Sequence, residues 1–307
     1  MDLPYRVSAV QWSLSPSEYA DDEAFFQAVR IRCEHAVQPE GTSLIVFPEL
    51  SGIWMLLSRL VPGTAEGKFR ALFQLARTSP RALLALMFRK GASVLAGDDH
   101  PSRWLAPFSA CAAEFGVYIC PGSTFLKGHD GRVRNTSCLI SPEGEVLGYR
   151  SKIHLTISEK KLGAVPGDCD TDLEPIETPW GNTGIAICLD GFYDDVIREL
   201  DRRKTVLVLQ PSANSIDWNS PVSSKEGKIP QHVQWLKTGI GHLIQGRRYI
   251  QTAVNPMDAT RHPLLKNSGC SSIWRNCSGT LQGPEQLAPD PYGECILSAE
   301  INGECQE

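Results

Sequence analysis

The sequence predicts an α/β protein built as one domain around a mixed sheet or a pair of sheets. Three observations support this prediction. Segments with the apolar pattern of strands alternate with segments of helical spacing, tight turns join some strands into hairpins, and no linker-like stretch interrupts the 307 residues. Alternating strands and helices are typical of layered α/β folds. A chain of this length can readily bury the core that such layers need.

The composition describes an ordinary globular chain. Hydrophobic residues make up 42% of it and charged residues 21%, and the formal net charge of -5 argues against nucleic acid as a partner. Residues 1–6 lack the charged and apolar regions of a signal peptide, and no apolar run is long enough to span a bilayer. The ten cysteines show neither a C-x-x-C pair nor a regular metal spacing. We therefore expect reduced thiols, no metal centre and a cytoplasmic protein.

The N-terminal end of the chain has a strand–helix–strand pattern. Residues 5–12 indicate a strand, and residues 21–37 carry the broad apolar stripe of a helix that stops at a Pro-Glu-Gly turn. Residues 43–47 form a continuous apolar run, which is typical of a strand buried on both faces. Glu49 follows this run. A carboxylate there is costly unless it is paired or faces a cleft, although a surface turn is the simpler interpretation of Glu49 taken alone.

Residues 51–106 differ from the rest of the chain. Residues 65–76 and 80–95 have helical spacing and a large apolar surface, and 68–90 is rich in Leu, Phe, Ala and Arg without any Asp or Glu. We expect a helical insertion that packs as a cap on the body of the protein or at a dimer interface. Two alternatives stay open: a hydrophobic lid over a site, or contact of 65–95 with an anionic membrane surface.

The second half of the chain supplies most of the remaining elements. Strand patterns occur at residues 116–123, 134–140, 146–150, 184–187, 205–210, 249–255, 269–274 and 295–301. Helical patterns occur at residues 108–114, 194–200 and 232–248. Loops are expected at residues 156–172 and 216–227.

Cys188 has a distinctive sequence context. A small, apolar approach over 184–187 suits a buried strand, and 194–200 has helical spacing with acidic residues in its first turn. We therefore expect Cys188 where a core strand ends and a helix begins. Such a position predicts a thiol with a lowered pKa beside free backbone N–H groups. A buried structural cysteine is the alternative interpretation.

Three polar residues, Glu49, Lys152 and Cys188, follow apolar strand segments. Their motifs are Phe47-Pro48-Glu49-Leu50, Tyr149-Arg150-Ser151-Lys152-Ile153-His154-Leu155 and Gly184-Ile185-Ala186-Ile187-Cys188-Leu189-Asp190. Flanking motifs are Arg134-Asn135-Thr136, Pro166-Gly167-Asp168, Trp180-Gly181 and Gln210-Pro211-Ser212-Ala213-Asn214. In the order and separation of these motifs the chain resembles the nitrilase superfamily of carbon–nitrogen hydrolases, in an amidase- or carbamoylase-like branch. The resemblance implies a four-layer α-β-β-α sandwich, one such domain over 1–307 with 51–106 as a helical insertion, and a homodimer or larger homo-oligomer.

The resemblance also assigns roles to the polar residues. Cys188 would be a nucleophile that forms a thioester, because a covalent intermediate divides attack on a poorly electrophilic amide carbon into two easier steps. Glu49 would act as general acid and base, and Lys152 would stabilise the oxyanion with help from the N–H of Leu189. Glu159 best matches the family's second glutamate and would position Lys152 and the substrate; Glu174 and Glu177 are weaker matches. No metal or organic cofactor is needed.

The residues around Cys188 bear on the substrate. Nitrile-cleaving branches tend to show Cys-Trp-Glu or Cys-Gly-Glu, whereas this chain has Cys188-Leu189-Asp190, which favours a small-molecule amide or carbamoyl-amine. We expect substrate contacts from Leu189, Asp190, Tyr193 and Asn214. The alternatives are a nitrilase acting on a nitrile and a non-catalytic scaffold that keeps the fold. A Cys–His dyad with His154 is a further, less favoured interpretation.

Overall fold

The computed structural model describes residues 4–13, 15–39, 41–53, 55, 99–224, 227–262, 265–276 and 283–301. Within these ranges the larger sheet has seven strands. Their order is β18 (Cys295–Glu300), β1 (Arg6–Gln11), β2 (Thr42–Val46), β3 (Tyr118–Cys120), β5 (Val133–Ile140) and β4 (Ser123–Lys127), with β6 (Val146–Ser151) also paired to β5. Strands β1, β2 and β3 run parallel, whereas β18 is antiparallel to β1, and β5 is antiparallel to β3, β4 and β6.

The second sheet has five strands in the described part of the chain. Their order is β17 (Gln286–Leu287), β16 (Ser272–Arg275), β12 (Thr252–Asn255), β8 (Leu207–Leu209) and β7 (Thr183–Ile185). Strands β7, β8 and β12 are parallel, and β16 is antiparallel to β12 and β17. Three small pairs complete the strands of the described residues: β9 (Ser212–Ala213) with β13 (Met257–Asp258), β10 (Pro221–Ser224) with β11 (Gly227–Pro230), and β14 (Arg261–His262) with β15 (Leu265–Lys266).

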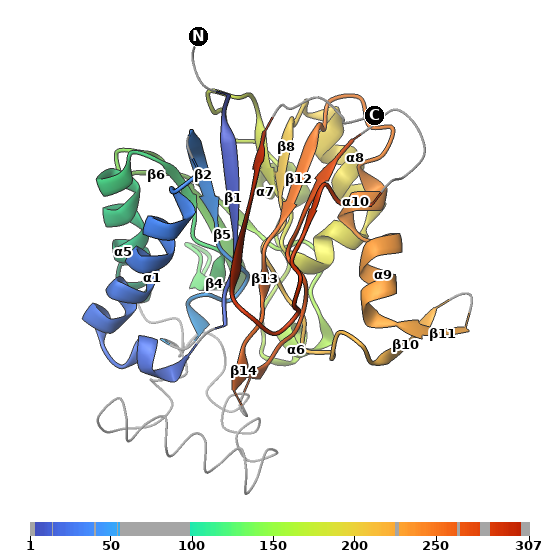
Figure 1. The fold of residues 1–307 in the computed structure, drawn as a ribbon, viewed down its shortest axis with the longest axis horizontal. Helices are drawn as coiled ribbons and strands as arrows, with labels where there is room; N and C mark the ends of the chain where they lie inside the picture. Colours follow the sequence, from blue (N-terminus) through green and yellow to red (C-terminus); the bar gives the residue numbers. More distant parts are fainter. Residues whose placement is uncertain are drawn as a thin grey trace, which may run out of the picture.

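Helices cover the outer face of each sheet, as Figure 1 shows. On the larger sheet lie α1 (Asp22–Ala36) and α5 (His100–Phe115), and on the smaller sheet lie α8 (Asp194–Arg202), α9 (Gln231–Thr238) and α10 (Ile240–Leu243). The shorter helical turns are η1 (Pro16–Tyr19), α6 (Ile157–Lys161), α7 (Cys169–Asp172) and η2 (Cys188–Phe192). The layers therefore follow the order helix, sheet, sheet, helix, and the predicted four-layer α-β-β-α sandwich is confirmed.

Strand β2 shows how the sequence produces these layers. Ile45 belongs to the apolar cluster that α1 and α5 form with the larger sheet, whereas Leu44 and Val46 belong to the cluster between the two sheets. Successive side chains of a strand point to opposite faces, so a strand that lies between two apolar layers needs an apolar residue at every position. The continuous apolar run at 43–47 predicted this double burial correctly.

The last residues of the segment expected as an insertion, at about 51–106, lie in a helix. Helix α5 begins at His100, and Trp104 and Leu105 are buried in the cluster beneath α1. Residues 100–106 therefore belong to the body of the sandwich, although the sequence analysis placed them in the insertion expected at about 51–106. The helices expected at 65–76 and 80–95 lie outside the described residues.

The long helix expected at 232–248 is interrupted. Helix α9 ends at Thr238, and Gly239 adopts an extended backbone before α10 begins at Ile240. A Cβ on Gly241 would lie 2.1 Å from the ring of Trp274, so this segment packs against the sheet through bare backbone. Glycine is a poor helix former, and two glycines in three residues allow the break. The loop expected at 216–227 also contains strand β10 and the first residue of β11.

None of the helices in the described ranges combines the length and the apolarity that crossing a bilayer requires.

Candidate active site

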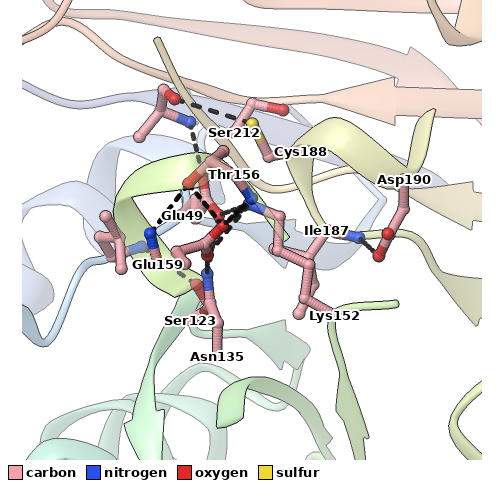
Figure 2. A network of polar contacts seen from close by, with 12 residues as sticks. Glu49, Ser123, Asn135, Lys152, Thr156, Glu159, Ile187, Cys188, Asp190 and Ser212 are labelled. Carbon is pink, nitrogen blue, oxygen red and sulfur yellow. Dashed lines mark hydrogen bonds and ion pairs between the residues drawn. The ribbon is translucent and has the colours of Figure 1, made fainter. Parts of the chain in front are cut away.

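The candidate catalytic residues lie where the chain leaves strands of both sheets. Glu49 follows β2 and Lys152 follows β6 in the larger sheet, whereas Cys188 follows β7 in the smaller one. Glu159 lies in α6, after β6. Figure 2 shows the four side chains converging on one another. Strand ends that are far apart in the sequence therefore meet where the two sheets pack.

Lys152 is the buried cation of this group. Its Nζ lies 2.7 Å from Oε1 of Glu49 and 3.1 Å from Oε1 of Glu159, and all three side chains are buried. Its backbone N–H donates to the carbonyl of Asn135 in β5 at 2.8 Å, which fixes the start of the side chain. Buried charges are costly unless paired, so the ammonium and the two carboxylates depend on one another.

Two residues that the sequence analysis did not assign to the site hold the carboxylates in place. Asn135 donates from Nδ2 to Oε1 of Glu49 at 2.8 Å and to Oε1 of Glu159 at 2.7 Å. Thr156 donates from its N–H and from Oγ1 to Oε2 of Glu159, at 2.7 and 2.8 Å. Thr156 and Glu159 have the spacing of a capping box, a signal that could have found Thr156. The motif around Asn135 marks its position but not its role.

The pKa values of the two carboxylates are displaced in opposite directions. Burial raises the pKa of Glu49, and Lys152 compensates only in part. Burial also acts on Glu159, but Lys152 and the hydrogen bonds from Asn135 and Thr156 outweigh it and lower the pKa of that carboxyl. Burial alone would lower the pKa of Lys152. The electrostatic interactions with Glu49, Cys188 and Glu159 outweigh burial, and the pKa of Lys152 is raised. Glu49 is therefore the carboxyl that takes up a proton more readily.

Cys188 opens η2 with a backbone φ of 48°, in the left-handed region that is uncommon for residues other than glycine. The predicted position between a strand and a helix is confirmed. Its Sγ donates to the carbonyl of Ala213 at 3.7 Å, and the N–H of Ala213 donates to Oε2 of Glu49 at 3.0 Å. Ala213 thus connects the thiol with the carboxylate.

The expected lowering of the Cys188 pKa is wrong. Burial, and next the charge of Glu49, raise the pKa of the thiol well above its usual value, although Lys152 opposes them. A single short 3-10 turn does not offset the loss of water around the sulfur. The raised pKa favours the protonated thiol, so attack by its sulfur would require a base close by.

Asp190 does not line the cavity beside Cys188, contrary to its prediction as a substrate-binding residue. Its buried carboxylate accepts backbone N–H groups from Ile153 at 3.2 Å, His154 at 2.7 Å and Ile187 at 3.1 Å. Burial raises the pKa of Asp190 to about 7 despite these hydrogen bonds. Asp190 therefore ties the segment after Lys152 to the turn before Cys188.

A cavity of about 480 Å³ opens beside Cys188, and its walls include Leu189, Tyr193 and Asn214. The carboxamide of Asn214 is engaged by the protein, because Nδ2 donates to the carbonyls of Ile216 at 2.7 Å and Ser268 at 3.1 Å. Asn214 therefore shapes the wall, and its Nδ2 is already committed. The volume lies within the range of small-molecule sites.

Further lining residues come from η2 and α9 and were not predicted. Phe192 and Trp235 meet edge to face with centroids 4.7 Å apart, and Gln231 and Gln234 add carboxamides to the same wall. Helix α9 lies within the segment expected to be helical, but no spacing signal indicates that one of its faces borders a cavity.

His154 is engaged elsewhere. Its ring stacks on Tyr193 with centroids 3.7 Å apart, and Nε2 lies 3.1 Å from the carboxylate of Asp195. These contacts do not favour the Cys–His dyad. In the described ranges no group of three or more His, Cys, Asp or Glu side chains is placed to hold a metal ion. The expectation that no cofactor is needed stays a prediction.

Comparisons with known proteins add to this geometry. The family model for carbon-nitrogen hydrolases matches residues 6–288. The chain is 22% identical to an aliphatic nitrilase of Sinorhizobium fredii (strain HH103) over 300 residues, 98% of this chain and 84% of that protein. It is 23% identical to an omega-amidase NIT2 of Xenopus tropicalis over 204 residues, 63% of this chain and 64% of that protein, so the match spans less than two thirds of the omega-amidase.

Solved structures show the same fold. A mutant of the amidase from Nesterenkonia sp. AN1, with acrylamide added to its active-site cysteine, matches with a TM-score of 0.62 and 17% identity over 96% of this chain and 92% of that chain. The layers, the strand-end residues and the family match agree. The chain belongs to the carbon-nitrogen hydrolase family.

Proposed function

We propose that the protein is a cysteine-dependent amidohydrolase that cleaves a non-peptide amide or carbamoyl-amine through a thioester on Cys188. The observation that carries the proposal is the buried Lys152 held between Glu49 and Glu159, with Glu49 linked to the thiol through Ala213. The family membership and the similarity to the omega-amidase of Xenopus tropicalis support the same reaction class. In the Nesterenkonia amidase acrylamide is attached to the active-site cysteine, which supports cysteine as the nucleophile here.

In the first step Cys188 attacks the substrate carbonyl carbon. Because burial raises the pKa of the thiol, its proton must pass to a base, and Glu49 has a raised pKa that suits it to accept the proton. The carbon–oxygen double bond opens into a tetrahedral oxyanion. The charged Lys152 and the N–H of Leu189 stabilise that oxygen.

In the second step the tetrahedral intermediate collapses. Glu49 returns the proton to the leaving nitrogen, the carbon–nitrogen bond breaks, and an amine or ammonia departs from the thioester. Water then attacks the thioester while Glu49 takes one of its protons. Collapse of the second intermediate breaks the carbon–sulfur bond, and the proton on Glu49 returns to Cys188.

The remaining cluster residues keep these groups in register. Glu159 has a lowered pKa, so it holds its charge and pairs with Lys152 throughout the cycle. Asn135 bridges the two carboxylates and keeps Oε1 of each directed at the ammonium. Opposite pKa shifts on neighbouring carboxyls separate the acid–base role from the positioning role.

A nitrilase activity is the second candidate. The alignment with the aliphatic nitrilase extends over 98% of the chain, farther than the alignment with the omega-amidase. In that case Cys188 would form a thioimidate before water enters. The Cys188-Leu189-Asp190 sequence favours the amide. A scaffold role is disfavoured because a fold without chemistry gains nothing from a costly buried cation between two carboxylates.

Intact-protein mass spectrometry tests the proposal. The protein is incubated with separate pools of short amides, carbamoyl-amines, acyl-amino acids and nitriles, and products are quantified in parallel. We expect turnover of at least one amide or carbamoyl-amine and an acyl adduct that maps to Cys188. Adducts and turnover with nitriles alone would support the nitrilase, and no turnover in any pool would contradict the proposal.

A further inference from the structure

Gln210 contacts the backbone of the candidate nucleophile, Cys188. It follows β8, its side chain is buried, and its Nε2 donates to the carbonyl oxygen of Cys188 at 2.7 Å. The N–H of Cys188 donates to the carbonyl of Pro211 at 2.9 Å. The backbone of Cys188 is thus held at both ends by two consecutive residues.

Gln210 is itself fixed by the neighbouring strand. Its N–H donates to the carbonyl of Val254 at 2.7 Å, and Asn255 donates from Nδ2 to the carbonyl of Gln210 at 2.7 Å. Both partners belong to β12 in the middle of the smaller sheet. The carboxamide that holds Cys188 therefore rests on a rigid element.

Gly191 makes room for this side chain. A Cβ at Gly191 would lie 2.1 Å from Nε2 and 2.4 Å from Cδ of Gln210, a separation that real Cβ atoms do not show. Gly191 does not have a positive φ, so its backbone does not require glycine. Glycine is needed at position 191 because any larger side chain would occupy the space of the Gln210 carboxamide.

We propose that Gln210 is a positioning residue for the nucleophile. Its hydrogen bond holds Cys188 in the left-handed conformation, φ 48°, from which Sγ reaches the carbonyl of Ala213 beside Glu49. Left-handed backbone is unfavourable for cysteine and persists only where the surroundings impose it. Gly191 is the partner that admits the carboxamide. The inference rests on the proposed function, in which Cys188 attacks the substrate.

Gln210→Met tests the inference, because methionine keeps the length of the side chain and loses the donor. Iodoacetamide labelling of Cys188 is followed over time by peptide mass spectrometry, and the exposed Cys169 serves as an internal control. We expect the rate at Cys188 to fall by about 10²-fold, since a misaligned thiol loses its base, while the rate at Cys169 stays the same. With a turned-over amide, kcat should fall by a similar factor with little change in KM.

Gly191→Ala provides a second, independent perturbation. We expect it to slow labelling of Cys188 as Gln210→Met does, because the new methyl group displaces the carboxamide. The double variant Gln210→Ala/Gly191→Ala should label Cys188 no more slowly than the slower of its two single variants, Gln210→Ala and Gly191→Ala, since both changes act on one contact. Thermal unfolding shows that each variant is folded, and Gly191→Ala carries the test if Gln210→Met does not fold.

Two results would overturn the inference: labelling of Cys188 at the wild-type rate or faster in Gln210→Met, or independent, additive losses in the double variant. Labelling needs no turnover substrate. A wild-type protein that hydrolyses none of the pools would contradict the proposed function, yet the labelling comparison would still decide the role of Gln210.

Discussion

Replacing Lys152 by methionine removes the ammonium of the buried cluster while keeping its volume. Glu49 and Glu159 would then face each other with Asn135 between them and no cation within the cluster. Removing one partner of a buried ion pair typically costs about 3–5 kcal/mol. Against a typical total stability of about 5–15 kcal/mol, that loss is large and measurable.

The loss should depend on pH in a defined direction. Burial already raises the pKa of Glu49 above its ordinary value, and loss of Lys152 raises it further. A carboxyl whose folded pKa exceeds its unfolded pKa destabilises the fold when it ionises. The penalty is therefore full above the folded pKa and shrinks as the pH falls through it, because the folded state then binds the extra proton.

Urea unfolding at about pH 8 and about pH 5 measures both effects. We expect the Lys152→Met loss to be larger at the higher pH, and Lys152→Met/Glu49→Gln to recover part of it there. Lys127→Met is the matched control, since Lys127 is exposed and its loss should stay within about 0.5 kcal/mol. A loss below about 1 kcal/mol at the higher pH, or one that grows toward the lower pH, would refute the reasoning. Residual kcat should be about 10²–10³-fold lower.

Three further predictions follow from the same geometry, and a fourth follows from the composition of 65–95. Cys188→Ala should abolish turnover and leave the circular dichroism spectrum unchanged; more than trace activity would show that Cys188 is not the nucleophile. Glu49→Gln should slow both formation and hydrolysis of the acyl-enzyme in rapid-quench experiments; a normal rate for one of these steps would show that Glu49 acts only in the other step. Asp190→Asn should lower the free energy of unfolding by about 1–3 kcal/mol in urea titrations, because both carboxylate oxygens accept backbone N–H groups and the NH2 group of asparagine cannot; an unchanged midpoint would contradict the role of Asp190 in tying the two segments together. If 65–95 contacts membranes, the protein should co-sediment with anionic vesicles at low salt and not at high salt, and a variant lacking 65–95 should not; absence of binding leaves the cap or lid.

Much of the fold could be predicted because its signals are local. The continuous apolar run before Glu49 indicates a strand covered on both faces, and β2 has that environment. The motifs around Lys152 and Cys188 indicate strand ends, which is where the structure has both. The three residues follow strands of which β2 and β7 end in buried residues and β6 is partly exposed, and they meet in one cluster, as their motifs indicated.

The parts that could not be predicted depend on contacts between distant segments. Asn135 lies inside a strand, where an asparagine has no pattern that shows it will bridge two carboxylates from other elements. The break at Gly239 follows from the packing of the next turn on Trp274, which helical spacing alone does not contain. The predicted direction of the Cys188 pKa shift was wrong for the same reason. Burial of the thiol depends on the packed sheets, and it outweighs the effect of the helical turn.

The origin of the site residues explains why sheet packing and chemistry are coupled. Glu49 and Lys152 come from the larger sheet, whereas Cys188 comes from the smaller one. Two contacts join these sides: the N–H of Ala213 on Glu49, and the carboxylate of Asp190 on the N–H groups after Lys152. A shift of one sheet against the other would move the Glu49 carboxylate relative to the Cys188 thiol. If Glu49 and Cys188 act as the proposed base and nucleophile, the packing of the sandwich sets the separation on which their proton transfer depends.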